Sequence, residues 1–338
     1  ALAGDSVYVN TSSLRYRTSA QIKDNNIAGN LSYGQKLERV GTSGQWTMIL
    51  LNGKKYYVSS AYVTSKKPAS AGAVQTTSQT AAGAQTSGGT AIALSSNYKY
   101  ANYSKINSGT ATLYRSTASN KKNKVVCVNA GHGTNGGGSV KTQCHPDGSA
   151  KVTGGTTGAG ATSAVAVSSG MTFADGTAES KVTLAMAKVL KTKLLNAGYD
   201  VLMIRESDDV QLDNIARTVI ANNNADCHIA LHWDSTSSNK GAFFMSVPSN
   251  ATYRAMEPVA SHWKQHNQLG ESLISGLKSA GVKIYSKGSM EMDLTQTSYS
   301  TIPSVDIELG DKASDHSGAT LETLANGLLA GVNTFFGQ

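Results

Sequence analysis

The sequence predicts two domains of different fold class: a small all-β barrel over residues 1–67, and an α/β domain over residues 98–338 with a mostly parallel sheet flanked by helices. Three observations predict this division. Short strand-like runs separated by glycines fill residues 1–67, residues 68–97 contain no charged and no aromatic residue, and strand-like and helix-like segments alternate beyond residue 124. A chain of 338 residues is long enough for two domains.

The N-terminal region reads as a series of short β-strands. The strand-like runs are VYVN, LRYR, KLERV, WTMIL and KKYYVSS, and glycines such as Gly29, Gly34, Gly44 and Gly53 separate them. Short strands at spacings of about ten residues, with turn residues between them, are typical of small barrels. We therefore expect a small β-barrel here.

Residues 68–97 form a tract of small and polar residues, PASAGAVQTTSQTAAGAQTSGGTAIALSSN. Such a composition cannot bury enough apolar surface to offset the loss of chain entropy on ordering. The tract is predicted to be a flexible linker between the two domains.

The positive charge of the chain is concentrated at its N-terminal end. The formal net charge is +8, and residues 1–96 carry nine Lys or Arg against three Asp or Glu. A basic surface favours a polyanionic partner, such as nucleic acid, acidic lipid or an anionic cell-wall polymer. Because aromatic residues are not interleaved with the basic ones as in single-strand binders, we expect no nucleic-acid partner.

Strands and helices are predicted to alternate along the second domain. Apolar runs indicate strands, and apolar residues three or four positions apart indicate helices. The predicted elements are a short hairpin around 111–116, strands at 125–129, 200–205, 227–232 and 304–309, and helices at 179–195, 212–220, 271–280 and from about 321 onward. This alternation predicts a mostly parallel sheet with helices on its faces. No apolar run approaches the roughly 20 residues that a membrane-spanning helix needs.

Four ionisable residues are expected to meet at one edge of this sheet. His132 follows a predicted strand, His232 and Glu308 end two others, and Glu179 opens a helix. Ligands of such sheets gather outside the carboxyl ends of the strands. Two imidazoles and one carboxylate suffice for a catalytic zinc site, which leaves the second carboxylate free to act. The glycines beside His132 allow a sharp turn where a side chain would crowd the site.

Four motifs in the second domain resemble a known enzyme family. VNAGHGTNG, ESKVTLAMAKVLKTKLLNAGYDVLMIRESDD, LDNIARTVIANNNADCHIALHWDS and IPSVDIELG follow, in order and spacing, the pattern of the zinc-dependent N-acetylmuramoyl-L-alanine amidases of the Amidase_3 type, over about residues 124–335. The resemblance implies that His132, Glu179 and His232 bind one Zn²⁺ and that Glu308 is the catalytic acid–base. It also implies cleavage of the peptidoglycan amide bond between N-acetylmuramic acid and L-alanine.

The sequence departs from this family pattern at three places. Asn129 stands where an Asp is usual, Asp234 stands where an Asn is usual, and residues 134–177 form a longer insert rich in Gly, Thr and Ser. None of these departures removes one of the four site residues. We expect the insert to lie beside the site and to influence the choice of substrate.

The N-terminal region resembles the bacterial Src-homology-3-like domains found beside cell-wall enzymes. The resemblance covers about residues 5–65 and is strongest in GKKYYVSSAYV. It implies a module that binds the cell wall, and the basic charge of this region suits anionic polymers of the wall. A role as a spacer, or in binding peptide, stays open for this module. The chain begins ALAG, and small residues at this spacing are typical of the cleavage site of a secretion signal, so we expect a secreted, cell-wall-associated protein.

Two other functions remain open from the sequence. One is a zinc peptidase that cuts within the peptidoglycan stem peptide, and the other is a catalytically inactive cell-wall-binding protein. Four other histidines are assigned structural roles, with His228 in the core, His262 and His266 on a solvated helix face, and His145 in an ordinary loop. His316 follows Glu308 closely enough that a contact with the substrate or a role in proton transfer stays open.

Overall fold

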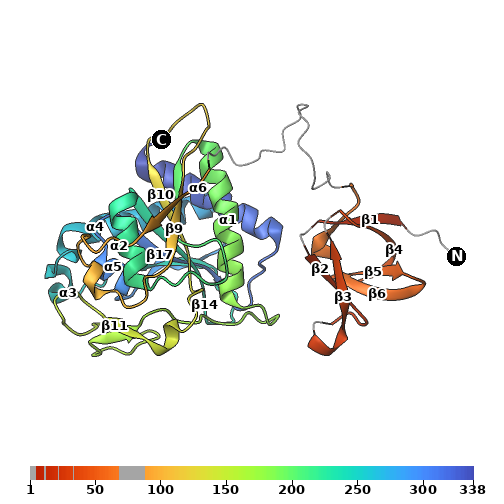
Figure 1. Ribbon diagram of the computed structural model, residues 1–338, viewed down its shortest axis with the longest axis horizontal. Coiled ribbons are helices and arrows are strands. Elements are labelled where there is room, and N and C mark those ends of the chain that lie inside the picture. The colour runs from red at the N-terminus through yellow and green to blue at the C-terminus, as the bar shows by residue number, and fades with distance from the viewer. Residues whose placement is uncertain (1–4, 11–12, 22, 33, 68–87) are drawn as a thin grey trace. The chain divides into compact units, whose positions relative to one another are not determined.

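The computed structural model describes residues 5–10, 13–21, 23–32, 34–67 and 88–338. The chain divides into two compact units, Ala1–Thr80 and Ala81–Gln338, which Figure 1 shows with most of their elements labelled. The predicted linker at 68–97 lies outside the described residues as far as residue 87. Its C-terminal part instead contains strand β8, Thr90–Ala93, which belongs to the sheet of the second unit.

The N-terminal unit is a seven-stranded antiparallel sheet. Its strands pair in the order β3-β2-β6-β5-β4-β1-β7. Their bounds are β1 Asp5–Val9, β2 Ser13–Arg17, β3 Ile27–Ser32, β4 Lys36–Ser43, β5 Trp46–Leu51, β6 Lys54–Ser59 and β7 Val63–Thr64. Alternate residues of these strands, among them Val7, Val9, Leu37, Ile49 and Val58, are buried in a small apolar core.

The prediction of a small barrel was wrong for this unit. A barrel requires every strand to pair on both sides, whereas in the described residues the outer strands β3 and β7 each pair with a single neighbour. Strand β7 has two residues, and both pair with β1. Within the described residues it therefore makes no pairing with β3 at the other end of the sheet. Strand spacing indicated a series of short strands but carried no information on whether the sheet closes.

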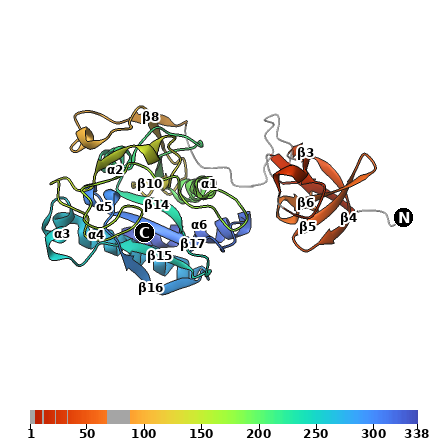
Figure 2. The same ribbon diagram turned by 90° about the horizontal axis from the view of Figure 1, so that it is seen from below.

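The second unit is built on an eight-stranded mixed sheet with the order β16-β15-β17-β14-β10-β13-β9-β8, which Figure 2 shows with β8 and β16 at opposite edges. The four central strands are parallel to one another, β15 is antiparallel to β17, and β9 is antiparallel to β13. Besides β8, its strands are β9 Thr110–Tyr114, β10 Val125–Ala130, β13 Asp200–Met203, β14 Cys227–Asp234, β15 Ala242–Ser246, β16 Ile284–Glu291 and β17 Ser304–Asp311.

The expectation of a mostly parallel sheet needs correction, because the sheet is mixed: the pairs β15–β17, β9–β13 and β8–β9 are antiparallel. Parallel neighbours require a long crossover connection, usually a helix. The loop between β14 and β15 runs only from residue 235 to residue 241, so the chain reverses direction and β15 pairs antiparallel with β17. Strand β9 likewise pairs antiparallel with both β8 and β13. Strands β15 and β16 were not predicted from the sequence.

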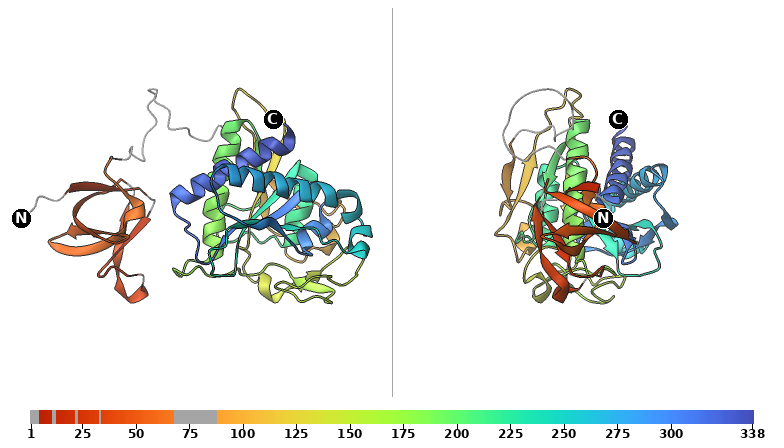
Figure 3. Two further views of the ribbon diagram at one scale, coloured as in Figure 1. Left: turned by 180° about the vertical axis from the view of Figure 1, so that it is seen from behind. Right: turned by 90° about the vertical axis from the view of Figure 1, so that its right-hand side faces the viewer.

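Helices cover both faces of this sheet. The long helices α1, Glu179–Ala197, α4, Val259–Ser279, and α6, Gly318–Phe336, share the larger core with one face, and Figure 3 shows them from behind. Helix α2, Asn214–Asn224, packs on the other face, with the short α5, Thr295–Tyr299, against it. The helix expected from residue 271 begins at Val259 and is preceded by the short α3, Ala251–Ala255.

The insert at 134–177 lies between β10 and α1. It contains a small antiparallel hairpin of β11, Lys141–Gln143, and β12, Ser163–Val165. None of the helices in the described part of the chain combines the length and the apolar character that a bilayer crossing requires.

Candidate metal centre and active site

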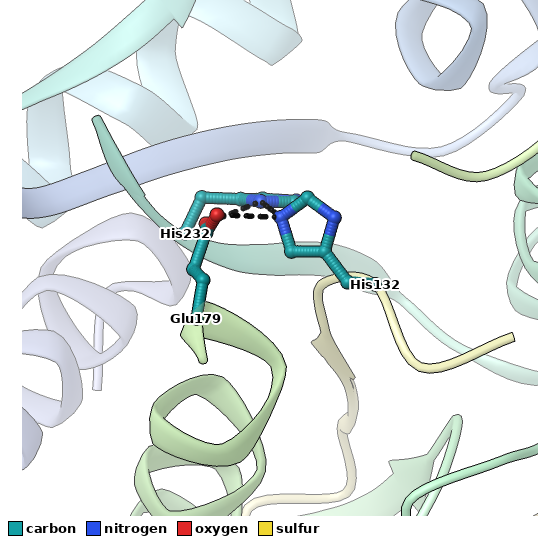
Figure 4. Close-up of side chains that lie close together, drawn as sticks. All are labelled: His132, Glu179 and His232. Atoms are coloured by element: carbon teal, nitrogen blue, oxygen red, sulfur yellow. Dashed lines mark hydrogen bonds and ion pairs between the residues drawn. The ribbon is translucent and has the colours of Figure 1, made fainter. Parts of the chain in front are cut away.

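Three of the predicted site residues come together from three different elements. His132 lies two residues beyond the end of β10, Glu179 is the first residue of α1, and His232 lies near the end of β14. One ligand atom from each lies within 4.8 Å of the others. His132 Nε2 is 2.9 Å from Glu179 Oε2 and 3.1 Å from His232 Nδ1, and Figure 4 shows the three side chains converging. Two nitrogens and one carboxylate oxygen form a donor set that suits Zn²⁺.

The glycines beside His132 are required by the close packing of this centre. An added Cβ at Gly131 would lie 2.2 Å from Cε1 of His232, and one at Gly133 would lie 2.5 Å from Cζ of Arg205. His132 itself adopts a left-handed backbone with φ +64°, and Gly133 follows with φ +76°. The glycine pattern in the sequence thus reflects both the turn and the room that the neighbouring side chains occupy.

The insert also approaches the centre closely, through Gly170. Its φ is +83°, and a Cβ there would lie 2.8 Å from Oε2 of Glu179 and 2.8 Å from Cδ2 of His132. Nothing in the sequence distinguished this glycine from the others in a glycine-rich segment. Its role follows only from the tertiary structure, which brings the insert against the two ligands.

Backbone groups hold two of the three ligands in place. His132 Nδ1 lies 2.8 Å from the carbonyl oxygen of Ser168, which can only accept a hydrogen bond, so Nδ1 carries the hydrogen and Nε2 faces the centre. Glu179 accepts hydrogen bonds from the backbone N–H of Met171 at 2.9 Å and of Trp233 at 3.0 Å. Burial raises the pKa of Glu179, but hydrogen bonds from His132 and His232 outweigh it and lower that pKa below its usual range.

Two buried arginines anchor the loop that carries His132. The Arg205 guanidinium donates to the carbonyl oxygens of Ala130 at 3.0 Å and Gly131 at 2.8 Å. Arg217 donates to the carbonyl oxygen of His132 at 2.7 Å and to Oδ1 of Asn129 at 3.1 Å. Hydrogen bonds from charged donors are stronger than those from neutral ones. They restrict the motion of a glycine-rich turn that would otherwise be flexible.

Glu308, the fourth predicted site residue, lies beside the three others. It pairs in register with His232 across β17 and β14, and both line a pocket of about 530 Å³. The Glu308 side-chain atom Oε2 is buried and has no hydrogen-bond partner among the described residues. Burial, reinforced by the charge of Asp306, raises the pKa of Glu308 well above its usual value. An unpaired carboxylate oxygen in a pocket is available to a ligand or to a proton.

A further carboxylate in the pocket, Asp306, was missed in the sequence. It lies two residues before Glu308 on β17 and faces the same pocket. Burial lowers the pKa of His232, but the carboxylates of Asp306 and Glu179 outweigh it and raise that pKa to about 10. Negative charge that favours a proton here would also favour a bound cation. The period-two alternation of a strand could have revealed Asp306, because residues two apart share a face.

The remaining histidines lie away from this centre. His228 is fully buried, as expected, with Nε2 3.1 Å from the amide nitrogen of Asn129. The solvated face expected for His266 was wrong, because the side chain is buried and its Nδ1 accepts from the backbone N–H of Ser304 at 3.0 Å. His145 is buried, and its Nε2 lies 2.9 Å from the carboxylate oxygens of Asp293, which ties the insert to the segment before α5.

Comparison with known proteins identifies the family. A family model described as N-acetylmuramoyl-L-alanine amidase, Amidase_3, matches residues 126–326, which is more than half of the chain. The chain belongs to the Amidase_3 family. Membership of this family supports a hydrolase that acts on the peptidoglycan of the cell wall. A search of curated protein sequences found no match.

Solved structures of amidases resemble the second unit. The N-acetylmuramyl-L-alanine amidase Ami1 from Mycobacterium smegmatis matches with 18% identity and a TM-score of 0.52, over 65% of this chain and 99% of that chain. Its likeness shows a shared fold. The apo form of Ami1 from Mycobacterium abscessus matches with 19% identity over 63% and 98% of the chains, with a TM-score of 0.49. An N-acetylmuramoyl-L-alanine amidase from Clostridium difficile 630 matches with 18% identity over 64% and 97%, with a TM-score of 0.45.

Proposed function

We propose that this protein is a zinc-dependent N-acetylmuramoyl-L-alanine amidase that cleaves the amide bond between N-acetylmuramic acid and L-alanine in peptidoglycan. The observation that supports this proposal is the convergence of His132, Glu179 and His232 beside Glu308 in one pocket, in a chain of the Amidase_3 family. The pocket also has polar and apolar walls, which suits a substrate that joins a sugar acid to a peptide.

The three convergent residues would hold one zinc ion. Two neutral imidazoles and one carboxylate leave a tetrahedral position open for substrate or water. When bound, zinc polarises a carbonyl group and makes water more acidic. The hydrogen on Nδ1 of His132 and the charged form of Glu179 leave both residues in the protonation state that a metal ligand needs.

Glu308 would act as the acid–base. Positive charge at the centre favours its carboxylate form over the protonated form that burial favours. The carboxylate would accept a proton from the water that attacks the carbonyl carbon, and would deliver it to the nitrogen of L-alanine as the C–N bond breaks. Its unpaired Oε2 has no competing partner among the described residues.

The N-terminal unit would hold the enzyme on the cell wall, and the protein would act outside the cell membrane. Its excess of basic residues suits anionic wall polymers, and Lys54, Lys55, Lys66 and Lys67 are exposed. We expect the full-length protein to sediment with purified walls, and changing these four lysines to glutamine to weaken sedimentation at low salt more than at high salt. Equal sedimentation of both proteins at low salt would contradict this role.

Digestion of purified peptidoglycan tests the enzymatic activity. We expect mass spectrometry to find glycan strands without peptides, and free stem peptides that begin with the amino group of L-alanine. A chelator should abolish this digestion, and His132→Ala should lose both zinc and activity. Products cut within the stem peptide would instead identify a peptidase, and the absence of any product would identify a binding protein.

A further inference from the structure

His232 presents both of its ring nitrogens to polar neighbours. Nδ1 lies 3.1 Å from Nε2 of His132 and 3.2 Å from Oε1 of Glu179, on the side of the proposed metal centre. Nε2 points the other way and lies 3.6 Å from Oδ2 of Asp306. Of the two nitrogens, Nδ1 is therefore the one placed to bind a metal.

The two imidazoles of the centre thus use opposite nitrogens. His132 turns Nε2 to the centre, because its Nδ1–H is held by the carbonyl oxygen of Ser168. His232 turns Nδ1 to the centre, which requires the hydrogen of the neutral ring to be on Nε2. In His132 a backbone acceptor fixes the tautomer, and in His232 the corresponding position is occupied by the Asp306 carboxylate.

Asp306 is placed for this contact by the sheet itself. It pairs in register with Ala230, beside the pair formed by His232 and Glu308, and all four residues line the same pocket. Its side chain is 14% exposed, and its Oδ1 is buried with no hydrogen-bond partner among the described residues. A largely buried carboxylate without full hydrogen bonding is unfavourable for folding, which calls for a compensating interaction.

We propose that Asp306 is a positioning residue that holds the Nε2–H of His232, so that Nδ1 offers its lone pair to the metal. The distance of 3.6 Å exceeds that of a hydrogen bond, so the interaction is the electrostatic attraction between the N–H group and the carboxylate. Histidines that bind metals commonly donate their second N–H to a carboxylate, which orients the ring and makes the ligand more basic. This inference rests on the proposed zinc centre.

Zinc affinity of three full-length variants tests the inference. Asp306→Ala removes the acceptor, Asp306→Asn keeps an acceptor oxygen but removes the charge, and Asp234→Asn removes another carboxylate of the same pocket, one paired with Lys240 at 2.7 Å. In competition with a chelator at pH 7, we expect Asp306→Ala to bind zinc about 10–100-fold more weakly than the unchanged protein. Asp306→Asn should fall between, and Asp234→Asn should stay within about threefold.

These variants separate orientation from general charge. If Asp306 acted only by its negative charge near the metal, Asp306→Asn would weaken binding as much as Asp306→Ala, and that result would overturn the inference. Unchanged zinc affinity in Asp306→Ala would also overturn it. If the unchanged protein itself did not bind zinc, the proposed function would fail first, so the two failures are distinguishable.

The imidazole hydrogen of His232 supplies a readout independent of affinity. In zinc-loaded protein with ¹⁵N-labelled histidine, we expect a slowly exchanging Nε2–H resonance from His232. This resonance should exchange faster and move upfield in Asp306→Asn, even if Asp306→Ala fails to fold. A resonance that is identical in Asp306→Asn and in the unchanged protein would refute the contact.

Discussion

Replacing Gly131 by alanine tests whether the glycine beside His132 is there to make room for the metal centre. The added methyl carbon would lie 2.2 Å from Cε1 of His232, whereas carbon atoms in contact are about 3.5 Å apart. The imidazole would therefore have to retreat by at least about 1.3 Å. A displacement of about 1 Å in an active site costs on the order of 10²-fold in rate, and we expect kcat/KM of Gly131→Ala to fall by about that factor, with weaker zinc binding.

Gly138→Ala is the matched control in the same loop. No atom lies within 4 Å of an added Cβ at Gly138, and its backbone is not left-handed, so we expect zinc affinity and activity like those of the unchanged protein. Zinc titration, peptidoglycan digestion and thermal unfolding of the metal-free variants should be measured together. Normal zinc affinity and activity in Gly131→Ala would refute the claim that contact with His232 requires glycine at this position.

Three further predictions concern the acid–base, acid stability and helix packing. Glu308→Gln should keep one zinc per chain, measured by metal analysis, while digestion slows by about 10²–10⁴-fold; loss of zinc would contradict its assignment as the unbound acid. Burial lowers the pKa of His228 and of His266 to about 3 from 6.5, so the unfolded chain binds more protons between these values and stability falls as pH drops. In denaturant titrations the unchanged protein should therefore lose about 2 kcal/mol more stability than His266→Gln between pH 7.5 and pH 5. An equal pH dependence of the two proteins would contradict the burial of a neutral ring at His266. Gly276→Ala would place a Cβ 2.2 Å from a backbone oxygen of α6 and should destabilise the fold by about 1–3 kcal/mol, whereas Gly318→Ala meets no atom within 4 Å and should not.

Local sequence was sufficient for the elements that carry the site. The apolar run before His132 and the helical spacing after Glu179 lie within contiguous segments, and the structure has β10 and α1 at those places. The carboxyl ends of neighbouring parallel strands share one edge of a sheet, so the sequence also predicted that His232 and Glu308 would be close. They pair in register across β14 and β17.

Features that depend on pairing between distant segments were not available from the sequence. Whether β3 and β7 close a barrel depends on which edges meet, and the direction of β15 depends on how a short loop turns. Hydrophobic periodicity reports which face of one segment is buried, but not which other segment covers it. The edge strands and the open N-terminal sheet therefore emerged only from the structure.

The sequence by itself determined that two histidines and two acids would gather at one end of a sheet. Local periodicity shows where each strand ends, and parallel strands bring their carboxyl ends to the same edge. Only the tertiary structure decided which nitrogen of each histidine faces the centre, that Asp306 lies against His232, and that Gly170 approaches Glu179. The physical reason is that such contacts depend on side-chain directions, and that a shift of a few tenths of an ångström between segments far apart in the chain makes or breaks them. Packing of the whole domain sets those distances.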